Sequence, residues 1–171
     1  EIPAMLKSSL TVKGDEDLEH KMENVISEQL VGEGFNEILN NSLSRVSYYE
    51  DDKLNAYPWA KTVKVMNPLS VDLGVMRQSI LFGGLDSLAR NINRKNSNLK
   101  FFEFGNTYCY DEACRTEEAP IKAYKQFYHL GLWVTGNHVQ GSWIHEDVKS
   151  SVYELKAYVL NVLRRLGLSA G

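Results

Sequence analysis

The sequence has little cysteine and no long apolar run, and each absence excludes a class of protein. It contains two cysteines, Cys109 and Cys114, among 171 residues, which is too few for the disulfide framework of a small secreted domain. No stretch reaches the roughly 18 consecutive apolar residues that span a bilayer. The first residues also lack the basic start and apolar run of a signal peptide. We therefore expect a cytoplasmic protein with no membrane partner and, because residue 1 is Glu, a fragment of a longer polypeptide.

Motifs that carry common chemistry are missing as well. The sequence has neither a Gly-x-x-x-x-Gly-Lys-Ser/Thr phosphate loop nor a Gly-x-Gly-x-x-Gly dinucleotide motif. Its four histidines are scattered without a His-Glu-x-x-His spacing, and Cys109 and Cys114 have no second pair, so we expect no metal site. There is no Gly-x-Ser-x-Gly nucleophile motif. The pair Gly83-Gly84 comes near a predicted helix start, where close packing explains it better than a bound phosphate.

The composition indicates one globular domain. Hydrophobic residues make up 43% of the sequence, charged residues 24% and aromatic residues 11%, which is ordinary for a folded protein and excludes disorder as the main state. A chain of this length buries roughly 70% of the surface that its unfolded form exposes. We therefore expect residues 1–171 to form a single domain that needs no metal or disulfide.

Hydrophobic periodicity predicts an α+β fold. Apolar residues at helical spacing predict helices, and alternating or aromatic-rich runs predict strands. Helices are expected over residues 15–35, 79–93 and 150–167, and strands over 35–44, 61–66, 99–110 and 126–135. Gly34 is expected to end the first helix, and Gly105 to bend or bulge its strand. The order of the elements and the lack of crossover helices favour a largely antiparallel sheet.

Charge is unevenly distributed. Residues 1–60 carry a net charge of −7, whereas residues 77–100 carry five basic residues against Asp86 alone. Such a basic stripe is typical of phosphate contacts with RNA, although a solvated helix face, or pairing with acids such as Glu103, is the simpler explanation. Arg77 differs from the others because its neighbours are apolar, so we expect it to have a defined partner. The five basic residues are Arg77, Arg90, Arg94, Lys95 and Lys100.

Several segments, in their order and spacing, carry a resemblance to a known family. The sequence resembles the beta chain of bacterial phenylalanyl-tRNA synthetase over essentially its whole length. This resemblance implies a class II aminoacyl-tRNA synthetase-like fold, with an antiparallel sheet flanked by helices. The segments that carry it best are Met66-Asn67-Pro68-Leu69-Ser70, Val75-Met76-Arg77-Gln78-Ser79-Ile80-Leu81 and Phe102-Glu103-Phe104-Gly105.

The resemblance also implies that this chain holds no catalytic residue. A working class II enzyme holds the ATP phosphate with an Arg placed two residues before a Glu. If Glu103 takes the Glu place, Phe101 stands where the Arg is needed, and a phenyl ring cannot make that charge-assisted contact. The chain then holds no cofactor of its own. ATP and magnesium would serve the full assembly, in the partner alpha chain.

Three hypotheses follow. The first is a non-catalytic structural core that docks the alpha chain, so that the assembly charges tRNA with phenylalanine. Its core or interface residues would be Met22, Ile26, Leu30 and Pro68. The second is an RNA-binding module that contacts tRNA through Arg77, Arg90, Arg94 and Lys95. The third is an active small-molecule ligase with a degenerate class II site.

Overall fold

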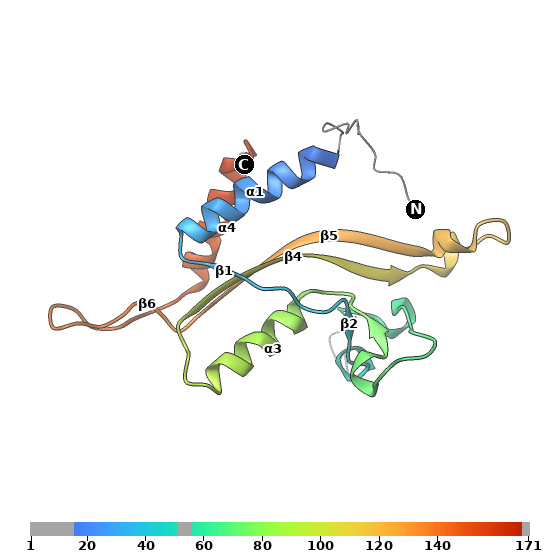
Figure 1. The fold of residues 1–171 in the computed structure, drawn as a ribbon, viewed down its shortest axis with the longest axis horizontal. Helices are drawn as coiled ribbons and strands as arrows, with labels where there is room; N and C mark the ends of the chain where they lie inside the picture. The colour runs from blue at the N-terminus through green and yellow to red at the C-terminus, as the bar shows by residue number, and fades with distance from the viewer. Residues whose placement is uncertain (1–15, 51–55, 169–171) are drawn as a thin grey trace, which may run out of the picture.

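The computed structural model describes residues 16–50 and 56–168, which are arranged around one long β-hairpin (Figure 1). Strands β4 (Leu99–Tyr110) and β5 (Tyr124–Thr135) pair antiparallel over their full length, with Leu99 opposite Thr135 and Tyr110 opposite Tyr124. The short strand β1 (Asn36–Glu37) adds to β4 in parallel. The resulting sheet has the order β1-β4-β5.

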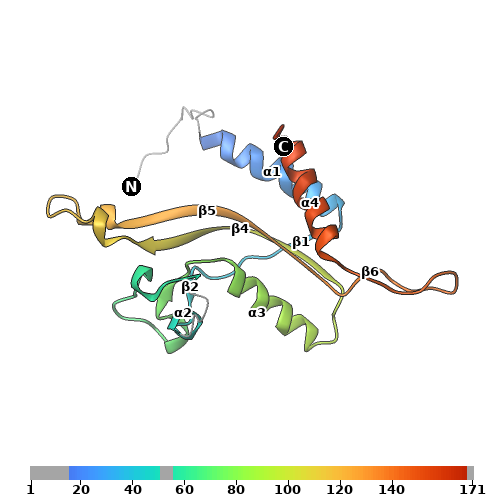
Figure 2. The same ribbon diagram turned by 180° about the vertical axis from the view of Figure 1, so that it is seen from behind.

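Helices cover both faces of this sheet (Figures 1 and 2). Helices α1 (Glu16–Gly32) and α4 (Val152–Arg165) lie on one face, and α3 (Leu81–Ile92) lies on the other. Side chains alternate between the faces of a strand, so Phe102 points toward α1 and α4, whereas Phe101 points toward α3. The hairpin therefore supplies side chains to two separate hydrophobic cores.

The core under α1 and α4 is built from aliphatic and aromatic side chains. Ile26, Leu30 and Phe35 pack against Phe102 and Val162. Helix α1 reaches this position because Gly34 adopts a left-handed conformation, with φ of 87°, and turns the chain toward β1. The predicted end of the first helix at Gly34 is thereby confirmed. The predicted start at Asp15 lies outside the described residues.

The core under α3 depends on a close approach between helix and sheet. Ile80, Leu88, Phe101 and Trp133 form this cluster. A Cβ atom placed on Gly84 would lie 2.1 Å from the indole of Trp133, so only glycine fits at this point of the helix. Close packing, rather than phosphate binding, is thus the structural role of Gly84.

The remaining elements are short. Strands β2 (Leu43–Ser44) and β3 (Val75–Met76) form a separate antiparallel pair, and β6 (Asn137–Val139) and β7 (Val148–Lys149) form another. One short α-helix, α2, covers Ser47–Glu50. Turns of 3₁₀ helix occur at Trp59–Lys61, Val71–Leu73, Glu112–Cys114 and Pro120–Ala123.

Two predicted strands were wrong, and so was the bulge offered for Gly105. Residues 61–66 form no strand, because the 3₁₀ turn Trp59–Lys61 includes their first residue and their pairing is limited to a single bridge between Lys64 and Val75. Residues 35–44 supply β1 and β2, which belong to different sheets. Gly105 causes no bulge, since the β4–β5 register runs through it unshifted. Its missing side chain instead leaves room for the guanidinium of Arg77. The other predicted helices and strands are confirmed, with shifts at their ends.

Candidate functional site

On the face of the sheet that α3 covers, Arg77 and Glu103 form a buried ion pair. The Arg77 Nη1 donates to Glu103 Oε1 at 2.6 Å, and both side chains are buried. The Arg77 Nε donates to the carbonyl of Asn106 at 2.8 Å, while the amide Nδ2 of Asn40 donates to the other Glu103 oxygen at 2.7 Å. This arrangement confirms that Arg77 has a defined partner, and it removes Arg77 from any exposed cationic surface.

Phe101 lies beside this pair on the same face of β4. Its ring is buried in the cluster with Leu88 and Trp133 rather than facing an open site. A nucleotide phosphate needs an accessible guanidinium or backbone donor here. The neighbouring positions 101 and 103 instead present a packed ring and a carboxylate that Arg77 already neutralises.

A polar cavity of about 220 Å³ lies between α3 and the segment around residues 40–48. Its charges are mostly matched within the protein. Arg45 forms an ion pair with Asp72 at 3.2 Å, and the hydroxyl of Tyr48 donates to Asp86 at 2.8 Å. Burial and this bond to Asp86 raise the pKa of the Tyr48 hydroxyl above its usual value. Arg90 also lines the cavity, and it is the one charged lining residue that makes no ion pair or hydrogen bond with a described residue.

The apolar stripe of α1 is only half covered. Residues 18, 22, 26 and 30 fall along one side of the helix. Ile26 and Leu30 are buried against the sheet and α4, whereas Leu18 is 62% exposed and Met22 is 43% exposed. Met22 is thus not a core residue of the described structure. The stripe continues from the core onto an open apolar surface.

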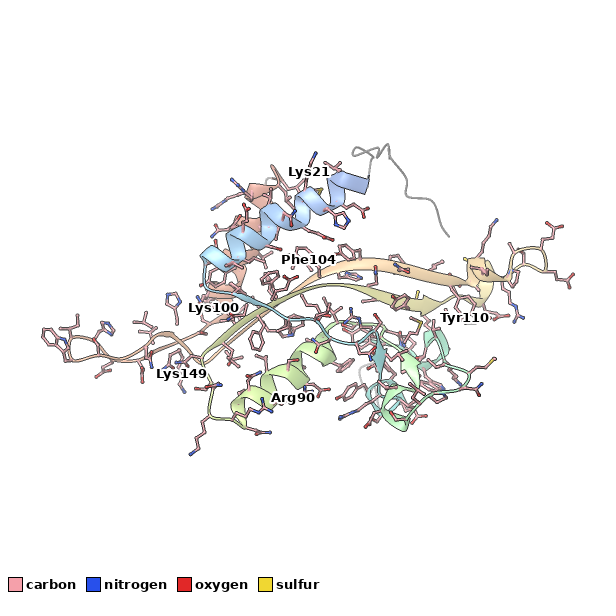
Figure 3. The ribbon with its side chains drawn as sticks, viewed as in Figure 1. Lys21, Arg90, Lys100, Phe104, Tyr110 and Lys149 are labelled. Carbon is pink, nitrogen blue, oxygen red and sulfur yellow. The ribbon has the colours of Figure 1, made fainter. Side chains whose placement is uncertain are left out.

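The basic stripe is split between two faces of the sheet. Arg90, Arg94 and Lys95 are exposed near the C-terminal end of α3, where Figure 3 marks Arg90. None of these three forms an ion pair with a described residue. Lys100 points to the opposite face and contacts α4, so it is not part of the same surface.

Lys100 belongs to a polar cluster at the start of α4 that periodicity did not reveal. It donates to the hydroxyl of Tyr158, which donates in turn to Glu154 at 3.0 Å. The ring nitrogen of His138 lies 2.8 Å from the same Glu154 oxygen. Burial alone would raise the pKa of Glu154, but the hydrogen bonds from His138 and Tyr158 outweigh it and hold that pKa below its usual value.

The predicted interface residue Pro68 lies in an exposed loop. Met66 and Leu69, its near neighbours, are almost fully exposed as well. This loop therefore does not join the core in the described structure, and it is open to a partner.

Residues 16–50 and 56–168 contain neither a metal site nor a membrane-spanning helix. No group of three or more His, Cys, Asp or Glu side chains there is placed to hold a metal ion. No helix in those ranges is both long and apolar enough to cross a membrane.

Comparison with known proteins gives one consistent family. A profile described as phenylalanyl tRNA synthetase beta chain CLM domain matches residues 2–170. The chain is 59% identical over 168 residues to the phenylalanine–tRNA ligase beta subunit of Bacteroides fragilis. This alignment covers 98% of the chain and 20% of that protein. It is 46% identical over 171 residues to the corresponding subunit of Porphyromonas gingivalis, covering 21% of that protein. The chain thus spans about a fifth of the length of these relatives.

Solved structures show the same fold at low identity. The chain matches an ATP phosphoribosyltransferase regulatory subunit/histidyl-tRNA synthetase from Bacillus halodurans with a TM-score of 0.63 and 16% identity, over 98% of this chain and 40% of that one. It matches a pyrrolysyl-tRNA synthetase from Desulfitobacterium hafniense with a TM-score of 0.55 and 15% identity. That match covers 88% of this chain and 45% of the other. These likenesses establish a class II aminoacyl-tRNA synthetase-like α+β fold, as the sequence predicted.

Proposed function

Because the chain belongs to the family of phenylalanyl-tRNA synthetase beta chain CLM domains, we propose that it docks the alpha chain of a phenylalanine–tRNA ligase. The domain itself is non-catalytic, and residues 1–171 act as one structural unit. In this proposal the assembly joins phenylalanine to tRNA in the cytoplasm. ATP and magnesium act in the alpha chain, because Phe101 stands where a phosphate-binding guanidinium would be needed.

The half-covered stripe of α1 carries the proposal. Leu18 and Met22 extend the apolar surface that Ile26 and Leu30 bury within the domain. Continuous apolar surface of this kind is typical of a helix that packs against a second protein. The exposed loop around Pro68 supplies further apolar side chains, those of Met66 and Leu69.

Substituting the exposed part of the stripe should abolish docking without unfolding the domain. We expect the double variant Leu18→Asp and Met22→Asp, made in the whole beta subunit, to lose the alpha chain in co-purification. Two carboxylates would have to be desolvated at an apolar interface, whereas both positions are exposed in the described domain. The control is Asn24→Asp, which places a single added carboxylate on the outer side of α1. Retention of the alpha chain by the double variant would contradict the docking role.

A second candidate, RNA binding, is favoured by the cluster Arg90, Arg94 and Lys95, which is exposed and makes no ion pair with a described residue. If these side chains contact tRNA phosphates, the combined change Arg90→Ala and Arg94→Ala should weaken tRNA binding at low salt. It should also reduce the slope of log affinity against log salt concentration by about 2. An unchanged slope in a filter-binding titration would remove this candidate and leave the docking role untouched.

A further inference from the structure

A two-stranded arm, residues 137–149, projects from one end of the long hairpin (Figures 1 and 2). It is formed by β6 and β7, and residues 140–149 are all exposed. Its tip is nevertheless ordered by local hydrogen bonds. The amide of Ser142 donates to the carbonyl of His145 at 2.9 Å, and the amide of Gly141 donates to the carboxylate of Asp147.

The ordered tip presents two large apolar side chains to solvent. Trp143 is 94% exposed and its neighbour Ile144 is 67% exposed. Single exposed apolar residues are common on protein surfaces. A tryptophan beside an isoleucine at the end of a projecting arm is a different case, because tryptophan is enriched among the residues that anchor protein interfaces.

The charge of the arm decides against a nucleic acid as its target. The arm carries two carboxylates, Glu146 and Asp147, near its tip, and one cation, Lys149, at its base. Phosphates would be repelled by these carboxylates, and binding to nucleic acid depends on cations at the contact. A protein surface with an apolar pocket fits the tip better.

The tip is small, which indicates that the surface receiving it belongs to the same polypeptide. A tryptophan buries roughly 150–250 Å², and with one isoleucine the total remains well below the roughly 1,200 Å² of a stable interface between separate chains. A contact within one chain needs far less area, because its effective concentration is high. The relatives are about five times longer than this chain, which covers 20% of the first of them, so most of such a polypeptide lies outside these residues.

We propose that the arm inserts Trp143 into an apolar pocket on another domain of the same beta polypeptide. The contact would fix the orientation of this domain within the subunit. The proposal is independent of the surface that docks the alpha chain, because it uses neither α1 nor the loop around Pro68.

Hydroxyl-radical footprinting of the whole beta subunit, with and without its alpha chain, tests this proposal. Trp133, which is 6% exposed, and a free tryptophan-containing peptide serve as the buried and exposed references. We expect Trp143 to be oxidised roughly tenfold more slowly than the peptide in the beta subunit alone, because an anchor residue is desolvated in its pocket. Fast oxidation with and without the alpha chain would overturn the proposal. Protection that needs the alpha chain, or that grows with subunit concentration, would also overturn it, because another chain would then be the occupant.

A variant supplies a second readout in the same subunit. Lys149 at the base of the arm, marked in Figure 3, is an exposed trypsin site. If Trp143 anchors the arm, Trp143→Ala should speed cleavage after Lys149 several-fold, since a released arm opens more often. Ile121→Ala, a change at another exposed apolar residue, at the tip of the long hairpin, should leave the cleavage rate unchanged. Equal rates in both variants and the unmodified subunit would contradict the anchoring role.

Discussion

Replacing Arg77 by methionine should lower the free energy of unfolding by about 3–5 kcal/mol, because it leaves a buried carboxylate without its counter-charge. Glu103 is fully buried and keeps only Asn40 as a donor once Arg77 is gone. Urea titration followed by circular dichroism measures this loss. The size of the effect depends on burial, since exposed ion pairs contribute at most about 1 kcal/mol.

Two controls separate this explanation from a simple loss of packing. Arg45→Met breaks the exposed pair with Asp72 and should cost less than about 1 kcal/mol. Arg77→Met combined with Glu103→Leu removes both charges and should recover much of the stability that the single change loses. If the double variant were as unstable as the sum of the two single variants, the isolated charge would not be the cause.

Gly84→Ala should be the second most damaging change, costing about 1–3 kcal/mol or more. The new Cβ would lie 2.1 Å from the Trp133 indole, so α3 must move away from the sheet and open its core. Gly32→Ala is the matched control, because nothing lies within 4 Å of a Cβ at that position of α1. We expect Gly32→Ala to be neutral or to stabilise the protein by up to about 1 kcal/mol.

Thermal melts of the two glycine variants give this comparison directly. A melting temperature for Gly84→Ala equal to that of the unmodified protein would show that α3 does not depend on close contact with Trp133. A loss of stability in Gly32→Ala would show that α1 tolerates no added side chain near its end.

The long regular elements could be predicted from the sequence because their signal is local. The aromatic run of residues 99–110 and the apolar period of residues 79–93 each specify their element without reference to the rest of the chain. The strand predicted over residues 61–66 failed for the opposite reason. Its alternation was present, but a strand also needs a partner, and β3 provides only two residues before the chain turns to bury Arg77.

Part of the candidate site could be predicted, because the spacing of apolar residues along a helix indicates which of them are buried. Ile26 and Leu30 are buried as their helical spacing predicts, and Glu103 was already a candidate acid for the basic residues. The separation of Lys100 from Arg90 was not predictable from net charge along the chain. It follows from the alternation of side chains in β4, which sends Lys100 toward Tyr158 and α4.

Hydrogen exchange of the beta subunit, measured with and without the alpha chain, tests the central claim most directly. The docking role predicts that amides of residues 18–25 in α1 exchange more slowly when the alpha chain is bound, because the exposed half of the apolar stripe becomes covered and local opening is suppressed. Amides of β4 that bond to β5 should not change, since those bonds lie within the domain. Unchanged exchange in α1, in a complex shown to be intact, would contradict the account.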